Sequence, residues 1–516
     1  RGEKWGMGNE RLRILELSDK PKRIKTMSPT KNNERLLAEP LPSSSMSAMF
    51  GDAMNVVKSF IGSNYLVMPF AFAQGGLVLG SFALVFIAVL TDHCCGLIVK
   101  CKRRAEANMI ARSEKPPVFT YGDVAREAFG ESVVDIVDAI LTFTQFGFCV
   151  EYFIFVVTTL RSFTPGTSLY LLALVPLSFL IPCAFLPSVQ SLSPVSALAN
   201  LAIMCGFVGI LSYDITTGGK DLFNLKGVVL FNWEQFPIFF SITMSCFEGI
   251  GTVLPVEQSM ASGSKNYPKM LHGAIGFTTC FLGSIGIIGL LRFEQHGVEQ
   301  IATENLPEKS SLTTCITSAL IFAILFTFPL QIFPVIQCCE KWALKPSKKD
   351  QKMFSTDKSY NPLQFEASQE VSGQEEARQQ EEGASNVIQL GSVGTWFFQT
   401  AGFPMLPDGE SFDAIVVYGP TAGLHLRKTY LLRTVIILFA SLIGLVAINY
   451  FSYIASLVGA LGATALSFII PSLIHMKLFP ELSMKELVGD VAICFIGVVA
   501  AVVGLYVTIK DWVKAV

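Results

Sequence analysis

Eleven apolar runs, most of them 20 residues or longer, constrain this chain of 516 residues more than any other feature. About 20 apolar residues let a helix cross roughly 30 Å of hydrocarbon. In lipid, only helices and closed barrels satisfy their backbone polar groups, and the runs lack the alternating pattern of barrel strands. We therefore expect an all-α polytopic membrane protein with eleven transmembrane helices, at about 50–73, 76–99, 133–160, 168–187, 193–213, 236–258, 269–291, 310–339, 429–449, 452–476 and 486–509.

The composition agrees with a chain whose main surroundings are a lipid bilayer. Charged residues make up 16% of the chain, against roughly 25% in soluble domains. The net charge of −2 gives no global field that would recruit DNA or RNA. The twelve Cys show no metal-ligand spacing, so we expect no metal site and no secreted disulfide scaffold.

Basic residues predict how the runs are oriented. The segments 1–49, 100–132 and 341–428 hold ten, seven and nine Lys or Arg, whereas all segments on the opposite side together hold seven. Because cytosolic loops carry the excess of Lys and Arg, we expect the N-terminus in the cytosol. The chain begins with Arg1 rather than Met, which is consistent with truncation upstream.

The predicted spans and their orientation divide the chain into four segments. Residues 1–49 are expected to be a cytosolic, disordered tail that is neither a signal peptide nor a span, and 50–340 hold helices 1–8. Residues 341–428 form a long cytosolic loop, partly disordered because of its Gln/Glu-rich stretch, and 429–516 hold helices 9–11 and a short tail. Patchy apolar residues at 391–424 are interrupted by Gly and Pro, so no further span is expected there.

Runs 1 and 6 are interrupted in a related way. Each has Gly at mid-membrane and a Pro a few residues later: Gly62 before Pro69, and Gly249 before Pro255. Gly and Pro weaken the helical ladder, and discontinuous helices in corresponding positions of two halves indicate a transporter's midplane site. Runs 1–5 and 6–10 would then be inverted halves, with run 11 appended. The alternative is that both are merely Pro-kinked, Gly-packed helices.

Two interrupted helices suit an amino acid. The N-terminal end of a half-helix presents N–H groups to a carboxylate, and carbonyls at the end of the other half accept an ammonium group. Side chains then set the size of the pocket. The residues expected to bind substrate are Gly62, Ser63, Asn64, Cys246, Phe247, Gly249 and Gln145.

Glu248 is the charged residue that most directly suggests a mechanism. A carboxylate in mid-span costs on the order of 3 kcal/mol or more unless it is paired or protonated, and a desolvated carboxyl group holds its proton more tightly. We expect Glu248 to couple protons to transport; the alternative is a structural carboxylate bonded to broken backbone. Glu257, Tyr152 and Gln331 are expected to lie on the pathway or at a gate, and the small residues around Gly459 to pack closely against a neighbouring helix.

Several motifs together resemble the amino acid/auxin permease family. The resemblance is closest to its proton-coupled amino-acid transporter branch, with fungal vacuolar neutral amino-acid exporters as relatives. The motifs are VK at 57–58 with IG at 61–62, LVFI at 84–87, HC at 93–94, TQFGFC at 144–149, FEGIG at 247–251, NLP at 305–307 and SLVGA at 456–460. The resemblance implies a LeuT-type fold and symport of small neutral amino acids with protons.

The chain departs from that family at three points. Asn64 adds a side chain where the family keeps bare backbone, and Asn55 stands where animal members place a His. The insert at 341–428 is far longer than the family's usual connection.

The reading favoured by these features is a secondary transporter that works by alternating access and needs no cofactor besides protons. Hydroxyl groups in run 8 leave sodium open as the coupling ion. The alternative function is an amino-acid-sensing receptor that docks cytosolic partners through 341–428. No clustered constellation of catalytic side chains stands at a membrane face, so we do not expect an enzyme. The Glu34-Arg35-Leu36-Leu37 sequence favours a vacuolar or lysosomal membrane over the plasma membrane.

Overall fold

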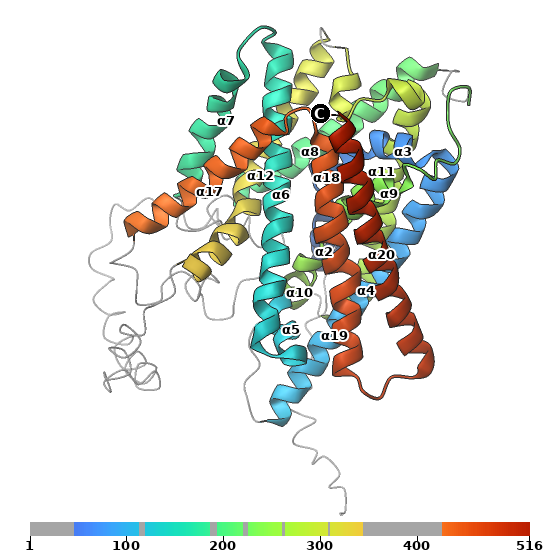
Figure 1. The fold of residues 1–516 in the computed structure, drawn as a ribbon, viewed down its shortest axis with the longest axis vertical. Coiled ribbons are helices and arrows are strands. Elements are labelled where there is room, and N and C mark those ends of the chain that lie inside the picture. The colour runs from blue at the N-terminus through green and yellow to red at the C-terminus, as the bar shows by residue number, and fades with distance from the viewer. Residues whose placement is uncertain are drawn as a thin grey trace, which may run out of the picture. The chain divides into compact units, whose positions relative to one another are not determined.

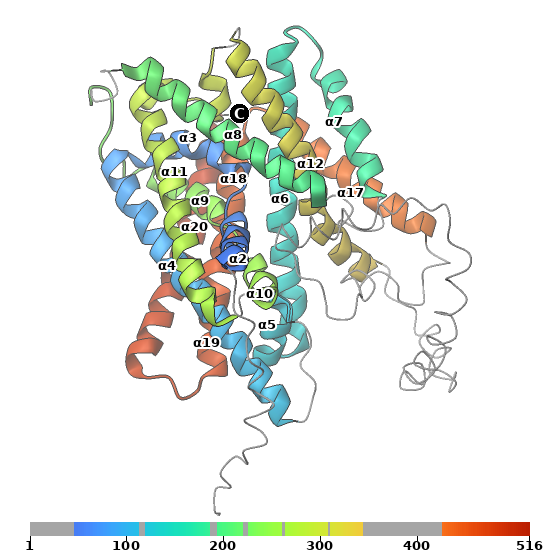
Figure 2. The same ribbon diagram turned by 180° about the vertical axis from the view of Figure 1, so that it is seen from behind.

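The computed structural model describes residues 46–112, 119–185, 193–219, 225–260, 264–307, 310–343 and 426–515. All regular secondary structure in these ranges is helical, which confirms the all-α expectation (Figures 1 and 2). The N-terminal tail up to residue 45, the long loop from residue 344 to 425 and the apolar patch at 391–424 lie outside the described residues.

Most helices follow the expected apolar runs closely, but the helix expected at 76–99 continues twelve residues further, to Ala111. The first part of the chain forms α2 (Met46–Lys58), η1 (Ser63–Val67), α3 (Met68–Gly75), α4 (Leu77–Ala111), α5 (Tyr121–Phe129), α6 (Glu131–Phe163), α7 (Leu169–Ala184) and α8 (Ser193–Gly218). The second part forms α9 (Phe236–Cys246), α10 (Ile250–Gln258), η4 (Ser264–Asn266), α11 (Tyr267–Gly297), η5 (Ala302–Asn305), α12 (Ser311–Ala343), α17 (Leu426–Val446), α18 (Phe451–Leu457), η6 (Val458–Ala463), η7 (Ala465–Ile469), α19 (Ile470–Leu478) and α20 (Met484–Ala515).

Nine helical segments of the described residues are long and apolar enough to cross a membrane. A tenth span results if the bent pair Met49–Lys58 and Ser63–Gly75 is counted as one, with a bend of 50°. The 16-residue helix α7 is apolar but shorter than the others. These helices make the chain an integral, multi-pass membrane protein.

Both of the interrupted runs are broken where their glycines predicted. α2 ends at Lys58, and the chain continues without α-helical geometry to the 3₁₀-helix η1, with Pro69 in the first turn of α3. The second break separates α9 from α10 at residues 247–249, and Pro255 lies inside α10. Because proline has no N–H to donate and glycine tolerates irregular backbone, neither segment can continue as one regular ladder.

The span formed by α18, η6, η7 and α19 contains twelve residues of mostly π-helical backbone, from Val458 to Ile469. Here it packs against α9 and α6, and Figure 1 shows it beside α6. A Cβ on Gly459 would lie 1.7 Å from the carbonyl oxygen of Ser241. The expected close packing of this small-residue stretch is therefore confirmed.

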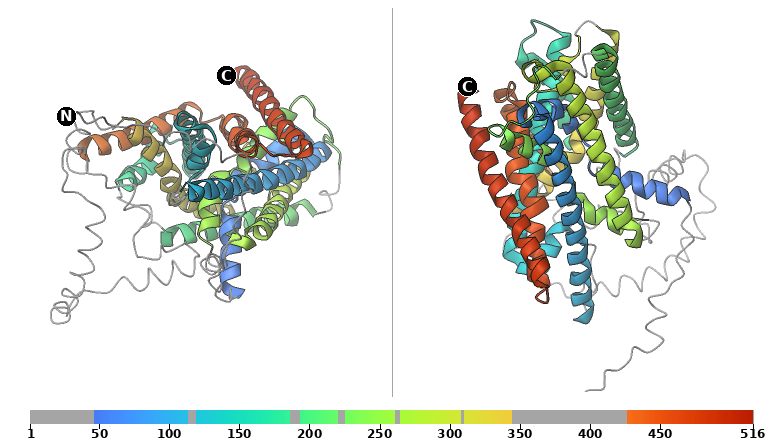
Figure 3. Two further views of the ribbon diagram at one scale, coloured as in Figure 1. Left: turned by 90° about the horizontal axis from the view of Figure 1, so that it is seen from below. Right: turned by 90° about the vertical axis from the view of Figure 1, so that its right-hand side faces the viewer.

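The helix bundle has two ends, which are distinguished by the short helices found there. α4, α5 and α19 pack together at one end, which we call the α5 end (Figure 1). At the other end, α6 turns into α7 and the segment of η5 connects α11 to α12; we call it the η5 end. Figure 3 shows α2 running across the direction of the long helices α4 and α11, and α2 packs against α11.

Candidate functional site

The two breaks face each other. The Cys246 thiol, at the end of α9, donates a hydrogen bond to the carbonyl oxygen of Asn64 over 3.3 Å. A Cβ on Gly249 would lie 2.5 Å from the carbonyl oxygen of Ser59 and 2.7 Å from the Phe60 ring. The second break thus touches the first on both sides of Glu248, and the absence of a side chain at Gly249 permits this approach.

One face of α6 lies along both breaks. A Cβ on Gly62 would lie 3.8 Å from the Tyr152 hydroxyl, and a Cβ on Gly251 would lie 3.4 Å from the Leu141 side chain. Gln145 stands between these two contacts, four residues after Leu141 and seven before Tyr152, on the same helical face. Its amide oxygen is buried without a hydrogen-bond partner among the described residues.

The predicted pathway residue Gln331 joins this group from α12. The Tyr152 hydroxyl interacts with the side chains of Ser63 and Gln331. The structure therefore brings together residues of both breaks, α6 and α12. Their roles in binding stay predictions.

Glu248 is half-buried within the second break. Its Oε1 atom is buried and has no hydrogen-bond partner in the described part of the chain, and it lies 3.9 Å from the Cβ position of Gly251. The carboxyl group is thus directed along the start of α10, toward the α5 end. One oxygen free of protein partners leaves room for a proton or a polar ligand.

Glu257 lies at the α5 end of α10 and is paired with two basic side chains of α4. Its carboxylate lies 2.7 Å from Lys102 Nζ and 3.3 Å from Arg103 Nη2, and only 1% of Glu257 is exposed. The next residue, Gln258, exchanges hydrogen bonds with the backbone N–H and carbonyl of Phe119, just ahead of α5. We call Glu257, Lys102 and Arg103 the ion-pair latch, because they fasten α10 to α4.

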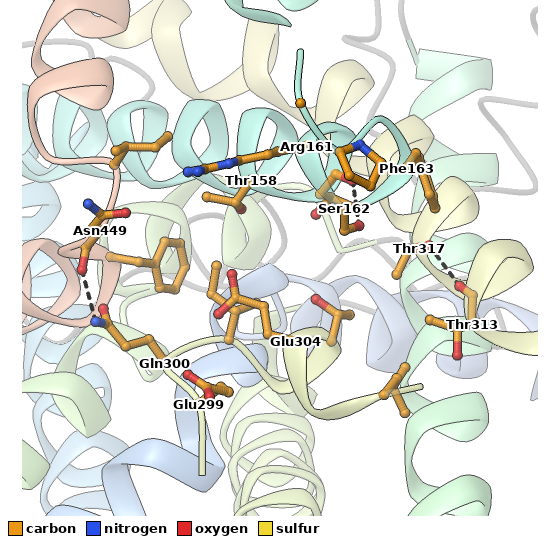
Figure 4. Close-up of a pocket in the computed structure, with 18 residues that line it drawn as sticks. Thr158, Arg161, Ser162, Phe163, Glu299, Gln300, Glu304, Thr313, Thr317 and Asn449 are labelled. Carbon is orange, nitrogen blue, oxygen red and sulfur yellow. Dashed lines mark hydrogen bonds between the residues drawn. The ribbon is translucent and has the colours of Figure 1, made fainter. Parts of the chain in front are cut away.

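A cavity of about 620 Å³ opens at the η5 end, away from the residues predicted for substrate (Figure 4). It is lined by the end of α6, the η5 segment, the start of α12 and the turn before α18. Arg161, Glu299 and Glu304 supply its charged side chains, and Gln300 Nε2 donates to the Asn449 carbonyl over 2.9 Å. η5 packs against η1 and α3, so the cavity lies over the first break.

Glu304 is the titratable group of this cavity that its surroundings perturb. Burial among protein atoms raises the pKa of Glu304 to about 7, and the nearby Glu299 carboxylate acts in the same direction. A hydrogen bond from the Ile301 backbone lowers the pKa in part. The side chain is also exposed, so solvent screens these effects in part. The pKa of Glu304 is therefore raised above the ordinary value of a carboxyl group.

Sequence reasoning missed Glu151, the most isolated carboxylate of the described residues. Glu151 is 0% exposed, and neither of its carboxyl oxygens has a hydrogen-bond partner there. A signal was present, because an acidic residue in the middle of an apolar run is unusual. Glu151 lies off the face of α6 that carries Gln145 and Tyr152.

No group of three or more His, Cys, Asp or Glu suited to a metal ion occurs in the part of the chain that the structure describes. The expectation that transport needs no metal stays a prediction.

The chain was compared with known proteins. The family described as "Transmembrane amino acid transporter protein" matches residues 46–510. Vacuolar amino acid transporter 3 of Schizosaccharomyces pombe is 27% identical over 312 residues, which cover 59% of this chain and 45% of that protein. Amino acid transporter AVT3A of Arabidopsis thaliana is 24% identical over 471 residues, covering 89% and 88%.

A third relative is the proton-coupled amino acid transporter-like protein pathetic of Drosophila melanogaster, 30% identical over 301 residues, which cover 55% of this chain and 62% of that protein. The chain spans less than half the length of the fungal relative that it matches. The family match nevertheless covers nine-tenths of the chain, including both breaks and all helices of the bundle. It agrees with the resemblance seen in the motifs, and it places the chain among transporters rather than enzymes. This chain is a member of the transmembrane amino acid transporter family.

Proposed function

We propose that this protein carries small neutral amino acids across a membrane together with protons, by alternating access. One observation carries the proposal: two helices break and touch each other at their breaks, through Cys246 and Asn64 and through Gly249 and Ser59. Irregular backbone at membrane depth is tolerated only where protein or a water-filled cavity meets it. Paired breaks of this kind form the substrate sites of many transporters.

The chemistry of the breaks suits a zwitterion. α10 begins at Ile250 and η1 at Ser63, so the first N–H groups of two short helices lie at the breaks. α2 and α9 end there and leave carbonyl groups. Glu248 is the only charged residue within 59–64 and 246–250. The breaks otherwise hold no charged side chain that could pair with a charged side chain of the substrate, so a neutral substrate side chain fits best. Ser63, Asn64 and Phe247 would limit its size.

The same breaks support a repeat of two halves. We propose that α2 to α8 form the first five spans, that α9 to α19 form the inverted second five, and that α20 is the eleventh. The broken helix opens each half. In this scheme α7 is a span, although its 16 residues reach only about 24 Å; a short span of this kind is accommodated by local thinning of the bilayer. The α5 end would face the cytosol.

We assign the coupling proton to Glu248 and the gate at the α5 end to the ion-pair latch. Glu248 combines a free carboxyl oxygen with a position inside the second break.

The name of the Drosophila relative includes proton coupling, and the Schizosaccharomyces pombe relative is named for the vacuole. We therefore favour a vacuolar or lysosomal membrane, with export of amino acids to the cytosol.

The proposal is tested by reconstituting the purified protein in liposomes and measuring uptake of labelled alanine, glycine and proline. Uptake should rise when the pH gradient is imposed, with and without sodium outside. The Glu248→Gln variant should bind substrate but lose the pH dependence. Absence of uptake of every neutral amino acid by folded protein would contradict the proposal, and uptake that follows sodium alone would reassign the coupling ion.

A further inference from the structure

Glu151 is a carboxyl group without a partner in the middle of α6. It is completely buried, and both of its oxygens lack hydrogen bonds from described residues. The cavity at the η5 end reaches Thr158 of α6, seven residues from Glu151, which corresponds to about 10 Å along the helix axis. An isolated, fully buried carboxylate ion is strongly disfavoured. The group must therefore carry a proton in this conformation.

Glu151 faces the π-helical span. A Cβ on Gly462 would lie 2.1 Å from the hydroxyl oxygen of Thr144 on α6, and Gly147 of α6 lies against the Val458 side chain. Glu151 follows Thr144 by seven residues and Gly147 by four, so it continues the same face by one further turn. α6 packs there against α18, which in turn packs against α9. Glu151 therefore lies where the broken span 6 meets the π-helical span.

Within the described ranges, no basic side chain is paired with Glu151. The ionisable side chains that interact with it are the Cys149 thiol and the Tyr152 hydroxyl of α6 and the Cys246 thiol of α9. Tyr453 of α18 stacks on Trp512 instead. Arg161, on the same helix, is ten residues away, which is about 15 Å along the axis.

Three basic side chains of the elements that pack against α6 have carboxylate partners elsewhere, and Lys428, in the first turn of α17, is exposed. These pairs are Lys341 of α12 with Asp138, Arg433 of α17 with Glu340, and Arg126 of α5 with Asp123 and Glu131.

A buried carboxylic acid that makes no hydrogen bond in one conformation is explained if it gains hydrogen-bond partners in another conformation. The segments around Glu151 allow such a change of conformation. Cys246 is the last residue of α9, and it is bonded across the break to Asn64. π-helical segments are common at functional sites, and the one opposite α6 and α9 is extensive. A shift of α9 against α18 would open the space at Glu151 to water.

We propose that Glu151 is a second proton-binding site, which takes up and releases one proton in each transport cycle. It lies on the η5 side of the breaks, whereas Glu248 lies near Gly251, opposite Leu141, about ten residues nearer the α5 end of α6. When α9 moves, the O–H bond of the Glu151 acid breaks, the proton passes to water, and the carboxylate keeps the electron pair. The inference rests on the proposed function, because it requires a proton-driven cycle.

The test compares Glu151→Gln with wild type in liposomes at clamped membrane potential. A gradient of one pH unit supports about tenfold accumulation of labelled alanine for each coupled proton, and therefore about a hundredfold for the two protons of Glu248 and Glu151. Glu151→Gln should lower the accumulation to about tenfold but keep exchange of labelled for unlabelled alanine at equal concentrations, because exchange needs no net proton movement. Glu151→Asp, which keeps the carboxyl group, should restore part of the accumulation.

Glu131→Gln is the matched control, since Glu131 lies on the same helix and its side chain is 81% exposed. It should accumulate alanine as wild type does. A readout independent of transport is the infrared C=O stretch of a protonated carboxylic acid, which Glu151→Gln should lose and Glu131→Gln should keep. If wild type accumulates nothing, the proposed function fails. If wild type and Glu151→Gln accumulate equally, or if the infrared band is unchanged, the second site is refuted while the proposed function stands.

Discussion

Glu257 is held by two cations of a neighbouring helix, and this makes it the residue whose loss should be felt most at the α5 end. Replacing Glu257 by Gln removes the charge that Lys102 and Arg103 meet. Lys102 is 6% exposed but keeps Glu106, 3.1 Å away, as a partner. We therefore expect a loss of about 2 kcal/mol in the free energy of unfolding, in the range for a charged hydrogen bond. Chemical unfolding in detergent measures this change.

The matched control is Glu481→Gln, which breaks the pair between Glu481 and Arg104 on the same end of the bundle. Those side chains are 56% and 39% exposed, and exposed pairs contribute about 0–1 kcal/mol. A second readout is maleimide labelling of Cys101, which is buried on α4 beside Lys102. Labelling should speed up in Glu257→Gln and not in Glu481→Gln. If Glu257→Gln and Glu481→Gln have equal effects, the ion-pair latch does not act as the gate.

Glu304 should make the stability of the protein depend on pH between about 4 and 7. Burial and the Glu299 carboxylate raise its pKa to about 7 in the folded protein, whereas an unfolded chain has a pKa near 4.3. The folded state therefore binds the proton more tightly, and stability falls as pH rises from the unfolded pKa to the folded pKa. The Glu304→Gln variant lacks this loss.

Thermal unfolding at pH 5 and pH 8 distinguishes the two proteins. The melting temperature of Glu304→Gln should exceed that of wild type by more at pH 8 than at pH 5. Glu299→Gln should recover part of the same difference, because it removes the neighbouring charge but not the burial. A difference that does not change with pH would show that the cavity fails to perturb Glu304.

The sequence allowed individual site residues to be predicted where local chemistry reveals them. Gly62 and Gly249 stand out because a glycine followed some residues later by a proline marks a break. Gly249 lies at the contact between the broken helices, and Gly62 lies near the Tyr152 hydroxyl of α6. The partners of Glu257 could not be inferred, since Lys102 is 155 residues away along the chain. The isolation of Glu151 could not be inferred either, because it depends on which face of α6 packs against α18 and η6.

Among the elements, the contact between α9 and η6 permits the least variation. A Cβ at position 459 would meet the Ser241 carbonyl oxygen at 1.7 Å and the Ser245 backbone nitrogen at 3.1 Å. Backbone atoms cannot turn aside as a flexible side chain can. Gly459→Ala should thus separate α9 from η6 and destabilise the fold by about 3 kcal/mol, the upper part of the range for overpacking.

Gly96→Ala is the control for that change. Gly96 is also within a membrane helix, α4, but a Cβ there meets nothing within 4 Å. Alanine should be neutral or stabilise the helix by up to about 1 kcal/mol. Melting temperatures of both variants in the same detergent give the comparison. Tolerance of alanine at position 459 would show that α9 and η6 are further apart than described.

Helix bounds were predicted well where composition alone decides them. The run expected at 236–258 corresponds to α9 and α10 from Phe236 to Gln258, and the run at 486–509 lies within α20. The η1 turn and the π-helical backbone of Val458–Ile469 were not predicted. Both depend on how closely neighbouring helices pack against this part of the chain, and hydropathy carries no information about that packing.

At the scale of the whole molecule, the excess of Lys and Arg makes a prediction about sidedness. If the α5 end faces the cytosol, a cysteine introduced at Glu481 should react with an impermeant maleimide only from the cytosolic side. A cysteine at Thr164, in the turn after α6, should react only from the other side. Vesicles of known orientation, with native thiols blocked beforehand, provide the assay. Labelling of both positions from one side would invert or abolish the proposed topology.

The π-helical backbone between α18 and α19 has a consequence for aligning this family's sequences. A π turn accommodates more residues than an α turn, so adding or losing one residue between Val458 and Ile469 can be absorbed by converting one kind of turn into the other. The side chains beyond the change then keep their neighbours, such as the His475–Asp490 pair between α19 and α20. Relatives that differ by one residue here can share the same packing, so an alignment gap in this stretch marks a change of winding and leaves the architecture intact.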